Sequence, residues 1–214
     1  MHIKTLNYQA VRLTLAAATL SFCSSLNASV IFTSLNGPQG AGYVVNGANA
    51  PTFPESVAAS FTGASTFILT NAAVEVLALP GQDPTFNAAI YTDNSGLPGT
   101  IITSIGSNLV APSSSGEVSV STPSVTLTGG TQYWLVLTPA EANTGVSWGD
   151  TATVTSGLSH TADTTGTSGW GFSASEPVEF EIDGAIVPAI PEPSTLLLAL
   201  PALGAFFFAR RRSA

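Results

Sequence analysis

Short runs of alternating hydrophobic and polar residues dominate the middle of the chain. In residues 178–183, Val178, Phe180 and Ile182 alternate with three acidic residues. Alternation with a period of two places the apolar side chains on one face of a β-strand and the polar ones on the other. We therefore expect a strand here whose apolar face covers a core and whose acidic side chains face water.

Further runs predict more strands. Residues 72–78 alternate in the same manner, and in residues 117–121 two valines alternate with Glu and Ser. The run Tyr133–Leu137 is apolar throughout, which is typical of a central strand covered on both faces. We expect Trp134 of this run to belong to the core.

Turn residues separate these runs at short intervals. Residues 93–96 (Asp-Asn-Ser-Gly) follow the predicted strand 86–91, and Gly129-Gly130 precedes Tyr133–Leu137. Adjacent glycines accept positive φ at no steric cost and favour a two-residue hairpin. Roughly nine or ten short strands at this spacing predict an all-β, jelly-roll-like antiparallel β-sandwich without a convincing helix. Residues 151–175, rich in Thr, Ser and Gly, predict a long and partly irregular excursion before the last strand.

The distribution of charge divides the chain into a body and two ends. All five basic residues lie in the ends, with no Lys or Arg between Leu13 and Ala209, whereas all thirteen acidic residues lie between Glu55 and Glu192. Binding to nucleic acid requires Lys and Arg to replace the counterions of the phosphates. The acidic body therefore excludes nucleic acid as a partner.

The first 28 residues have the order of a secretory signal peptide. Lys4 and Arg12 precede an apolar run, 13–23, and small or polar residues follow up to a plausible cleavage site after Ala28. Cys23, the single cysteine, also suggests a lipoprotein, but Phe22 stands where a lipidation motif requires a small residue. Cleavage would leave a body, residues 29–187, without disulfides or thiolate metal ligands.

The last segment, residues 188–214, combines a Pro-Glu-Pro triplet, an apolar stretch and a basic end: Pro191, Glu192, Pro193; Leu196 to Ala209; and Arg210, Arg211, Arg212. A helix over residues 194–209 would be roughly 24 Å long, which is short for a bilayer but spans it if the bilayer thins. The arginines then act as a cytoplasmic stop, and the body lies outside the cell. We expect a single transmembrane helix here.

This order of triplet, apolar helix and arginine cluster resembles the PEP-CTERM sorting signal. The resemblance implies recognition by an exosortase in the inner membrane of a Gram-negative bacterium, after export and signal-peptidase cleavage. Tail processing and transfer to the cell surface or extracellular matrix would follow. An ordinary C-terminal membrane anchor is the alternative, but it needs neither the triplet nor so short a helix.

The body is similar to the choice-of-anchor domains, which are extracellular β-sandwich modules. The similarity covers about residues 40–150 and is carried by the sequences at 57–61, 89–99, 127–137 and 147–149. It implies a β-sandwich outside the cell. It does not supply a catalytic residue.

Few residues of the body suggest catalysis or metal binding. His160 is the only histidine of the body, and without a nucleophile elbow we expect it in an exposed loop rather than in a hydrolase site. No cofactor is expected, although an acidic body leaves calcium open because Ca²⁺ prefers carboxylate and carbonyl oxygens. Asp93, Asp150 and Asp163 are the calcium-ligand candidates, and solvated surface acids are the alternative.

Trp148 and Trp170 stand in Gly-flanked segments, where an aromatic ring could stack on a sugar or close an edge of the sandwich. We therefore expect a non-catalytic, exosortase-sorted surface or matrix protein that contributes to exopolysaccharide or biofilm structure. A carbohydrate-binding adhesion module, with or without calcium, is the second hypothesis, and a hydrolase is the third.

Overall fold

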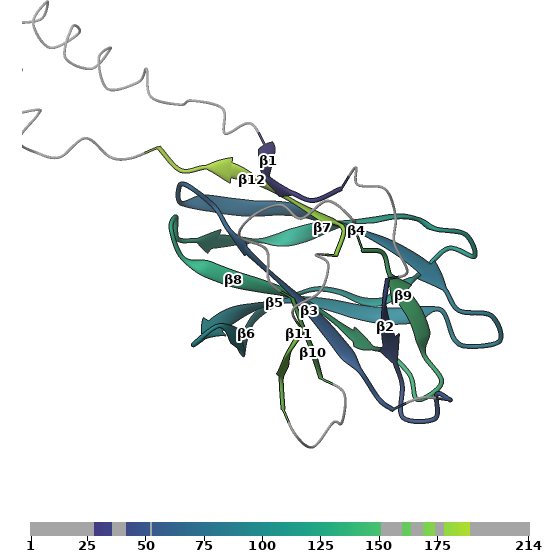
Figure 1. Cartoon of the computed structure of the whole chain (residues 1–214). Helices are drawn as coiled ribbons and strands as arrows, with labels where there is room; N and C mark the ends of the chain where they lie inside the picture. The colour runs from purple at the N-terminus through teal and green to yellow at the C-terminus, as the bar shows by residue number, and fades with distance from the viewer. Residues whose placement is uncertain are drawn as a thin grey trace, which may run out of the picture.

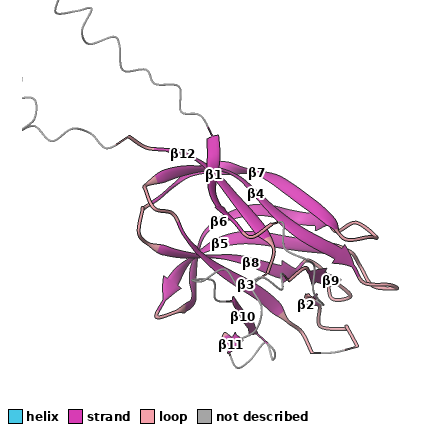
Figure 2. Cartoon of the chain, turned by 45° about the horizontal axis from the view of Figure 1, so that its top comes forward, coloured by secondary structure: helices cyan, strands magenta, loops and turns pink. Residues whose placement is uncertain are grey.

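The computed structural model describes residues 28–35, 42–51, 53–150, 160–163, 169–173 and 178–188. This part of the chain forms strands and turns and contains no helix (Figure 2). The strands are β1 (Ala28–Thr33), β2 (Tyr43–Asn46), β3 (Ser56–Thr62), β4 (Phe67–Ala78), β5 (Thr85–Asn94), β6 (Leu97–Val110), β7 (Gly116–Leu127), β8 (Gln132–Pro139), β9 (Gly145–Trp148), β10 (His160–Asp163), β11 (Gly171–Ser173) and β12 (Phe180–Ile186).

The strands form two sheets (Figure 1). One has the order β1-β12-β4-β9-β2, with β7 also paired to β4, and the other has the order β11-β10-β3-β8-β5-β6. All pairs between these strands are antiparallel. The predicted all-β, antiparallel, two-sheet architecture is therefore confirmed, and the jelly-roll assignment stays a prediction.

Strand β4 organises the first sheet. Strand β7 pairs with one edge of β4 from Phe67 to Val76. Strands β12 and β9 share the other edge, where β12 pairs with the residues from Phe67 to Val74 and β9 pairs with those from Val76 to Ala78. The alternation expected in residues 72–78 is confirmed only in part. Ala72, Val74 and Val76 are buried as predicted, but Ala73 on the opposite face is buried too, and Ala78 is half-buried.

The core lies between the two sheets and contains a group of aromatic rings. Phe180 of β12 has its ring centroid 6.2 Å from that of Phe61 on β3 and 6.1 Å from that of Trp148 on β9, both in edge-on contact. Edge-to-face pairs at such separations add to the free energy of burial.

Strand β8 is buried on both of its faces, as predicted for a central strand. Leu135 and Leu137 belong to the core between the sheets, whereas Trp134 and Val136 form a second cluster with Ala58 of β3. Because β8 lies between β3 and β5, its backbone is paired on both edges, and both faces are apolar. The prediction that Trp134 is buried is confirmed.

The hairpin predicted at Gly129-Gly130 is wrong. Strand β7 belongs to one sheet and β8 to the other, so the turn connects the sheets instead of pairing two neighbouring strands. Gly130 does take a positive φ of 72°. A Cβ on Gly129 would lie 2.5 Å from the backbone carbon of Ser65, so the glycine is needed for the close approach of the β3–β4 loop.

The expectation that Glu179 faces water is also wrong. Its side chain is 3% exposed, although its two apolar neighbours point into the core as predicted. The backbone N–H of Glu179 donates to the carbonyl of Gly149 at 2.8 Å, and its carboxylate oxygen Oε2 lies 3.7 Å from where a Cβ of Gly149 would be. Gly149, the residue that follows β9, therefore lies over Glu179 just before β12 begins.

The first and last strands lie side by side. Ala28 of β1 is opposite Ala185 of β12, and β12 continues along β4 until Ile186 is opposite Phe67. The chain thus enters and leaves the sandwich at one end, and cleavage after Ala28 would remove only the first residue of β1. Within the described residues, no helix has the length and hydropathy to cross a membrane. The predicted C-terminal helix lies outside those residues.

Candidate functional site

Trp148 is a core residue. Its side chain has no exposed surface, and its indole N–H donates to the carbonyl of Glu179 at 2.9 Å. Trp148 is the last residue of β9, and the pairing of this strand places Trp148 between Val76 of β4 and Tyr43 of β2. A sugar ring cannot stack on this side chain in this structure, which favours the packing alternative.

Trp170 has a different environment. It is half-buried and packs against the second cluster, which contains Trp134 and the partly buried Tyr91. This cluster lies on the face of the second sheet that is turned away from the first, because Leu135 and Leu137 of β8 point to the core between the sheets. The structure therefore does not bring Trp148 and Trp170 together on one binding face.

Asp93 ties a hairpin to the neighbouring strand. Its Oδ1 accepts hydrogen bonds from Trp134 Nε1 and Gln132 Nε2, both at 2.8 Å, and its Oδ2 accepts one from the Gly96 N–H at 3.2 Å. The turn is the predicted one, with Ser95 and Gly96 at φ of 58° and 85°. These contacts give the Asp93 carboxylate a structural role.

The other calcium-ligand candidates lie elsewhere. Asp150 is 6% exposed and forms an isolated bridge with Val178, while Asp163 ends β10 opposite Ser56 and only its backbone is described. The three aspartates thus belong to three separate elements. The described residues contain no group of three or more His, Cys, Asp and Glu side chains that could hold a metal ion.

The loop expected at His160 is a strand in the structure. The backbone of His160 begins β10 and is opposite Ala59 of β3. Strand β10 also pairs with β11, so two short strands interrupt the predicted irregular excursion.

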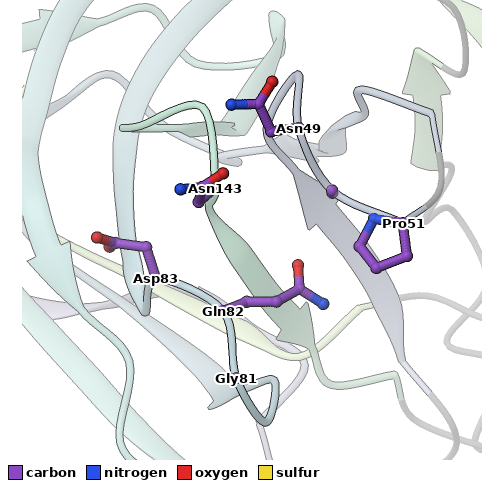
Figure 3. Close-up of a pocket in the computed structure, with 7 residues that line it drawn as sticks. Asn49, Pro51, Gly81, Gln82, Asp83 and Asn143 are labelled. Carbon is purple, nitrogen blue, oxygen red and sulfur yellow. The ribbon is translucent and has the colours of Figure 1, made fainter.

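A polar pocket lies where three loops meet at one end of the sandwich (Figure 3). Its volume is about 430 Å³, which is within the usual range for small-molecule sites. The loops follow β2, β4 and β8, and the lining residues are Asn49, Ala50, Pro51, Gly81, Gln82, Asp83 and Asn143. The lining thus contains three primary amides and one carboxylate, with Pro51 and Asp83 on opposite sides of the hollow and the Asp83 carboxylate pointing away from Pro51 (Figure 3).

Backbone hydrogen bonds hold the three loops in place. Asn49 N–H donates to the carbonyl of Ala142 at 2.7 Å, and Asp83 N–H donates to the carbonyl of Asn143 at 2.9 Å. Gly145 N–H returns a bond to the carbonyl of Asp83 at 2.9 Å. The loop after β8 therefore holds both of the other loops, and the rim of the pocket is formed before any ligand binds.

Two side chains in the pocket wall have unusual surroundings. The Thr85 hydroxyl and N–H both donate to Asp83 Oδ1 and lower the pKa of this carboxyl below its ordinary 3.8, so it is ionised at neutral pH. The oxygen Oε1 of Gln82 is buried and has no hydrogen-bond partner within the described residues. A Cβ on Gly145 would lie 2.1 Å from this oxygen, so only glycine leaves room for the Gln82 side chain.

The sequence interpretation missed this pocket. Its residues are separated by more than 90 positions, from Asn49 to Asn143, and each loop alone has the Gly, Pro, Asn and Asp content of an ordinary turn. The one available signal was the presence of Asn or Gln within two residues of Gly or Pro in each of these turns, which does not by itself indicate that the turns meet.

The candidate sorting residues Pro191, Glu192 and Pro193 and the arginines Arg210, Arg211 and Arg212 lie outside the described residues. No curated protein matches the chain. Residues 189–213, which include the whole triplet and the arginine cluster, match the family model of the PEP-CTERM protein-sorting motif. The chain thus carries the PEP-CTERM sorting motif of exported bacterial surface proteins that an exosortase processes.

Proposed function

We propose that this chain is a non-catalytic protein of the cell surface or extracellular matrix, released from its membrane-held form by an exosortase. The observation that carries the proposal is the match of residues 189–213 to the sorting motif. Signal peptidase would remove residues 1–28, and the sorting enzyme would cut near Pro191–Pro193. The β-sandwich would then be the part that remains outside the cell.

The arrangement of the terminal strands supports this order of events. Strands β1 and β12 pair with each other (Figure 1), so both ends of the sandwich that border processed segments lie at one end of the body. A folded sandwich can therefore stand on the membrane by its tail, with the junction to that tail next to the bilayer. Cleavage there would not disturb the sheets, because β12 ends at Ile186.

The body's role in exopolysaccharide or biofilm structure is the second part of the proposal. The acidic body repels anionic surfaces, and its lack of Lys and Arg disfavours binding to acidic polymers. Neutral polysaccharide is the matrix component that this charge permits. The alternative of an adhesion module that stacks sugars on Trp148 is disfavoured by the burial of that side chain.

The triplet itself can be tested in cells that produce the protein. Replacing Pro191, Glu192 and Pro193 with alanine should keep the chain in the inner-membrane fraction, because the sorting enzyme no longer recognises it. Quantitative immunoblots of membrane and surface fractions measure the distribution. Pro188→Ala, a proline change just before the matched residues, is the control and should behave as wild type. Equal surface delivery of the alanine variant would contradict the proposal.

A further inference from the structure

We propose that the polar pocket formed by the loops after β2, β4 and β8 binds a neutral sugar unit of a glycan. The inference extends the proposed matrix role, but it concerns a site that sorting does not require. Binding is measured on purified protein and sorting in cells, so failure of one is distinguishable from failure of the other.

The chemistry of the lining favours a hydroxyl-rich, uncharged ligand. Primary amides both donate and accept hydrogen bonds, and the pocket has three of them, on Asn49, Gln82 and Asn143. A sugar's vicinal hydroxyls present the matching donors and acceptors. The Asp83 carboxylate accepts two bonds from Thr85 at Oδ1 and points away from Pro51 at the edge of the hollow (Figure 3), so the three amides are the main groups for a ligand.

Charge excludes the competing ligand classes. An anion would meet the ionised Asp83 and no Lys or Arg, since the body has neither. A divalent cation such as Ca²⁺ needs about six to eight oxygen ligands that converge on one point, from carboxylates and from backbone or amide carbonyls. The one carboxylate of the pocket lies across the hollow from Pro51 and away from the Gln82 amide, so these groups do not converge (Figure 3). An apolar partner would leave the amides unpaired.

Two features add apolar contact, which sugar rings also need for their C–H faces. Pro51 presents its ring at one side of the hollow (Figure 3). The same loop carries Phe53, whose side chain is 74% exposed. An exposed aromatic ring on a binding loop can pack against a second sugar unit of a chain.

The wall of the pocket also contains an unsatisfied acceptor. Buried polar atoms in folded proteins nearly always have a partner, and Gln82 Oε1 has none within the described residues. A shift of this side chain away from Gly145 would let a sugar hydroxyl supply the missing donor. Because backbone bonds already hold the loops, little ordering accompanies binding.

The position of the pocket suits a ligand outside the cell. Strand β4 begins opposite the last residue of β12 and ends at Ala78, just before the pocket residues 81–83. At about 3.3 Å per residue, the pocket lies about 36 Å along β4 from the point where the tail leaves. A sandwich standing on its tail therefore presents the pocket at its far end.

The test is an array of neutral hexose- and pentose-terminated glycans, with uronic-acid-terminated counterparts, probed with the full chain purified in detergent. We expect neutral glycans to bind, acidic counterparts to bind more weakly, and chelation of calcium to change nothing. Affinities for the best neutral glycan then follow from titration calorimetry.

The decisive variant is Asn49→Ala combined with Asn143→Ala, two exposed residues that hold the loops through backbone groups, which the substitutions keep. Loss of both should weaken binding by about tenfold or more, since each hydrogen bond contributes about a threefold to tenfold effect. The matched control is Asn94→Ala, an exposed amide at the opposite end of β5. Thermal unfolding should be unchanged in both proteins.

Three results would overturn the inference. They are the absence of binding to every neutral glycan, an equal loss of affinity in Asn94→Ala and in the pocket variant, and binding that disappears with the chelator. The last result would mean that a cation and not the amide set holds the ligand.

Discussion

Trp148 and Trp170 look alike in the sequence, because glycines flank both residues. The structure separates them by burial: Trp148 has no exposed surface and a hydrogen-bonded indole, while Trp170 is half-buried on the outer cluster. A side chain that is closed off from water contributes to stability and not to recognition. Composition around a residue does not reveal this difference, because the covering groups come from distant strands.

We expect Trp148→Ala to destabilise the protein by about 3–5 kcal/mol, the usual cost of removing a large aromatic side chain from a core. Trp170→Ala should cost less than half as much, since that side chain is already partly in water. Trp148→Phe keeps a ring but removes the N–H donor, so its destabilisation should lie between those of Trp148→Ala and Trp170→Ala. Urea unfolding followed by circular dichroism measures all three. Equal stability of the two alanine variants would contradict the burial assigned to Trp148.

Glu179 shows where sequence reasoning stops for single residues. The alternation around it correctly predicts that Phe180 and Ile182 face the core. The same pattern cannot predict whether the opposite face meets water or another part of the chain, because period two describes only one strand. The chain at Gly149 covers Glu179, and that contact depends on the order of strands in the sheet.

Among the secondary-structure elements, strands with a strong pattern could be predicted and their partners could not. The apolar run of β8 has the burial that the sequence indicates, and the alternation in β4 has it in part. The turn between β7 and β8 has the glycines of a hairpin but connects two sheets. Turn chemistry describes the backbone angles of a few residues, whereas sheet membership depends on which apolar faces pack together.

The β5–β6 hairpin makes a testable connection to β8 through Asp93. Asp93→Ala should destabilise the protein by about 1–3 kcal/mol, because the fully buried Trp134 loses the acceptor for its indole N–H. Asp93→Asn keeps an oxygen at that position and should recover most of the loss. Chemical denaturation gives the free energies of unfolding.

The same variants separate the structural role of Asp93 from calcium binding. A structural carboxylate predicts that a chelator leaves the unfolding midpoint of the wild-type protein unchanged. A fall in that midpoint on chelation, matched by Asp93→Asn, would instead favour the calcium interpretation.

For the molecule as a whole, the two ends of the body differ: one borders the leader and the tail, and the other contains the pocket. In Figure 1, β1 and β12 lie at the upper left, while β2 and β9 lie toward the right, where the pocket loops begin and end. The tethered end was foreseeable from the sequence, because leader, body and tail differ in charge and hydropathy. The pocket end was not foreseeable, since its three loops follow strands of two different sheets and lie far apart in the sequence.

The central claim, that the tail is a sorting signal removed during delivery, can be measured directly on the mature product. Intact-mass and C-terminal peptide mass spectrometry of the protein recovered from the cell surface or medium should find a chain that begins after Ala28. It should also find that this chain ends before Arg210. A surface form that still contains Arg210, Arg211 and Arg212 would contradict the account.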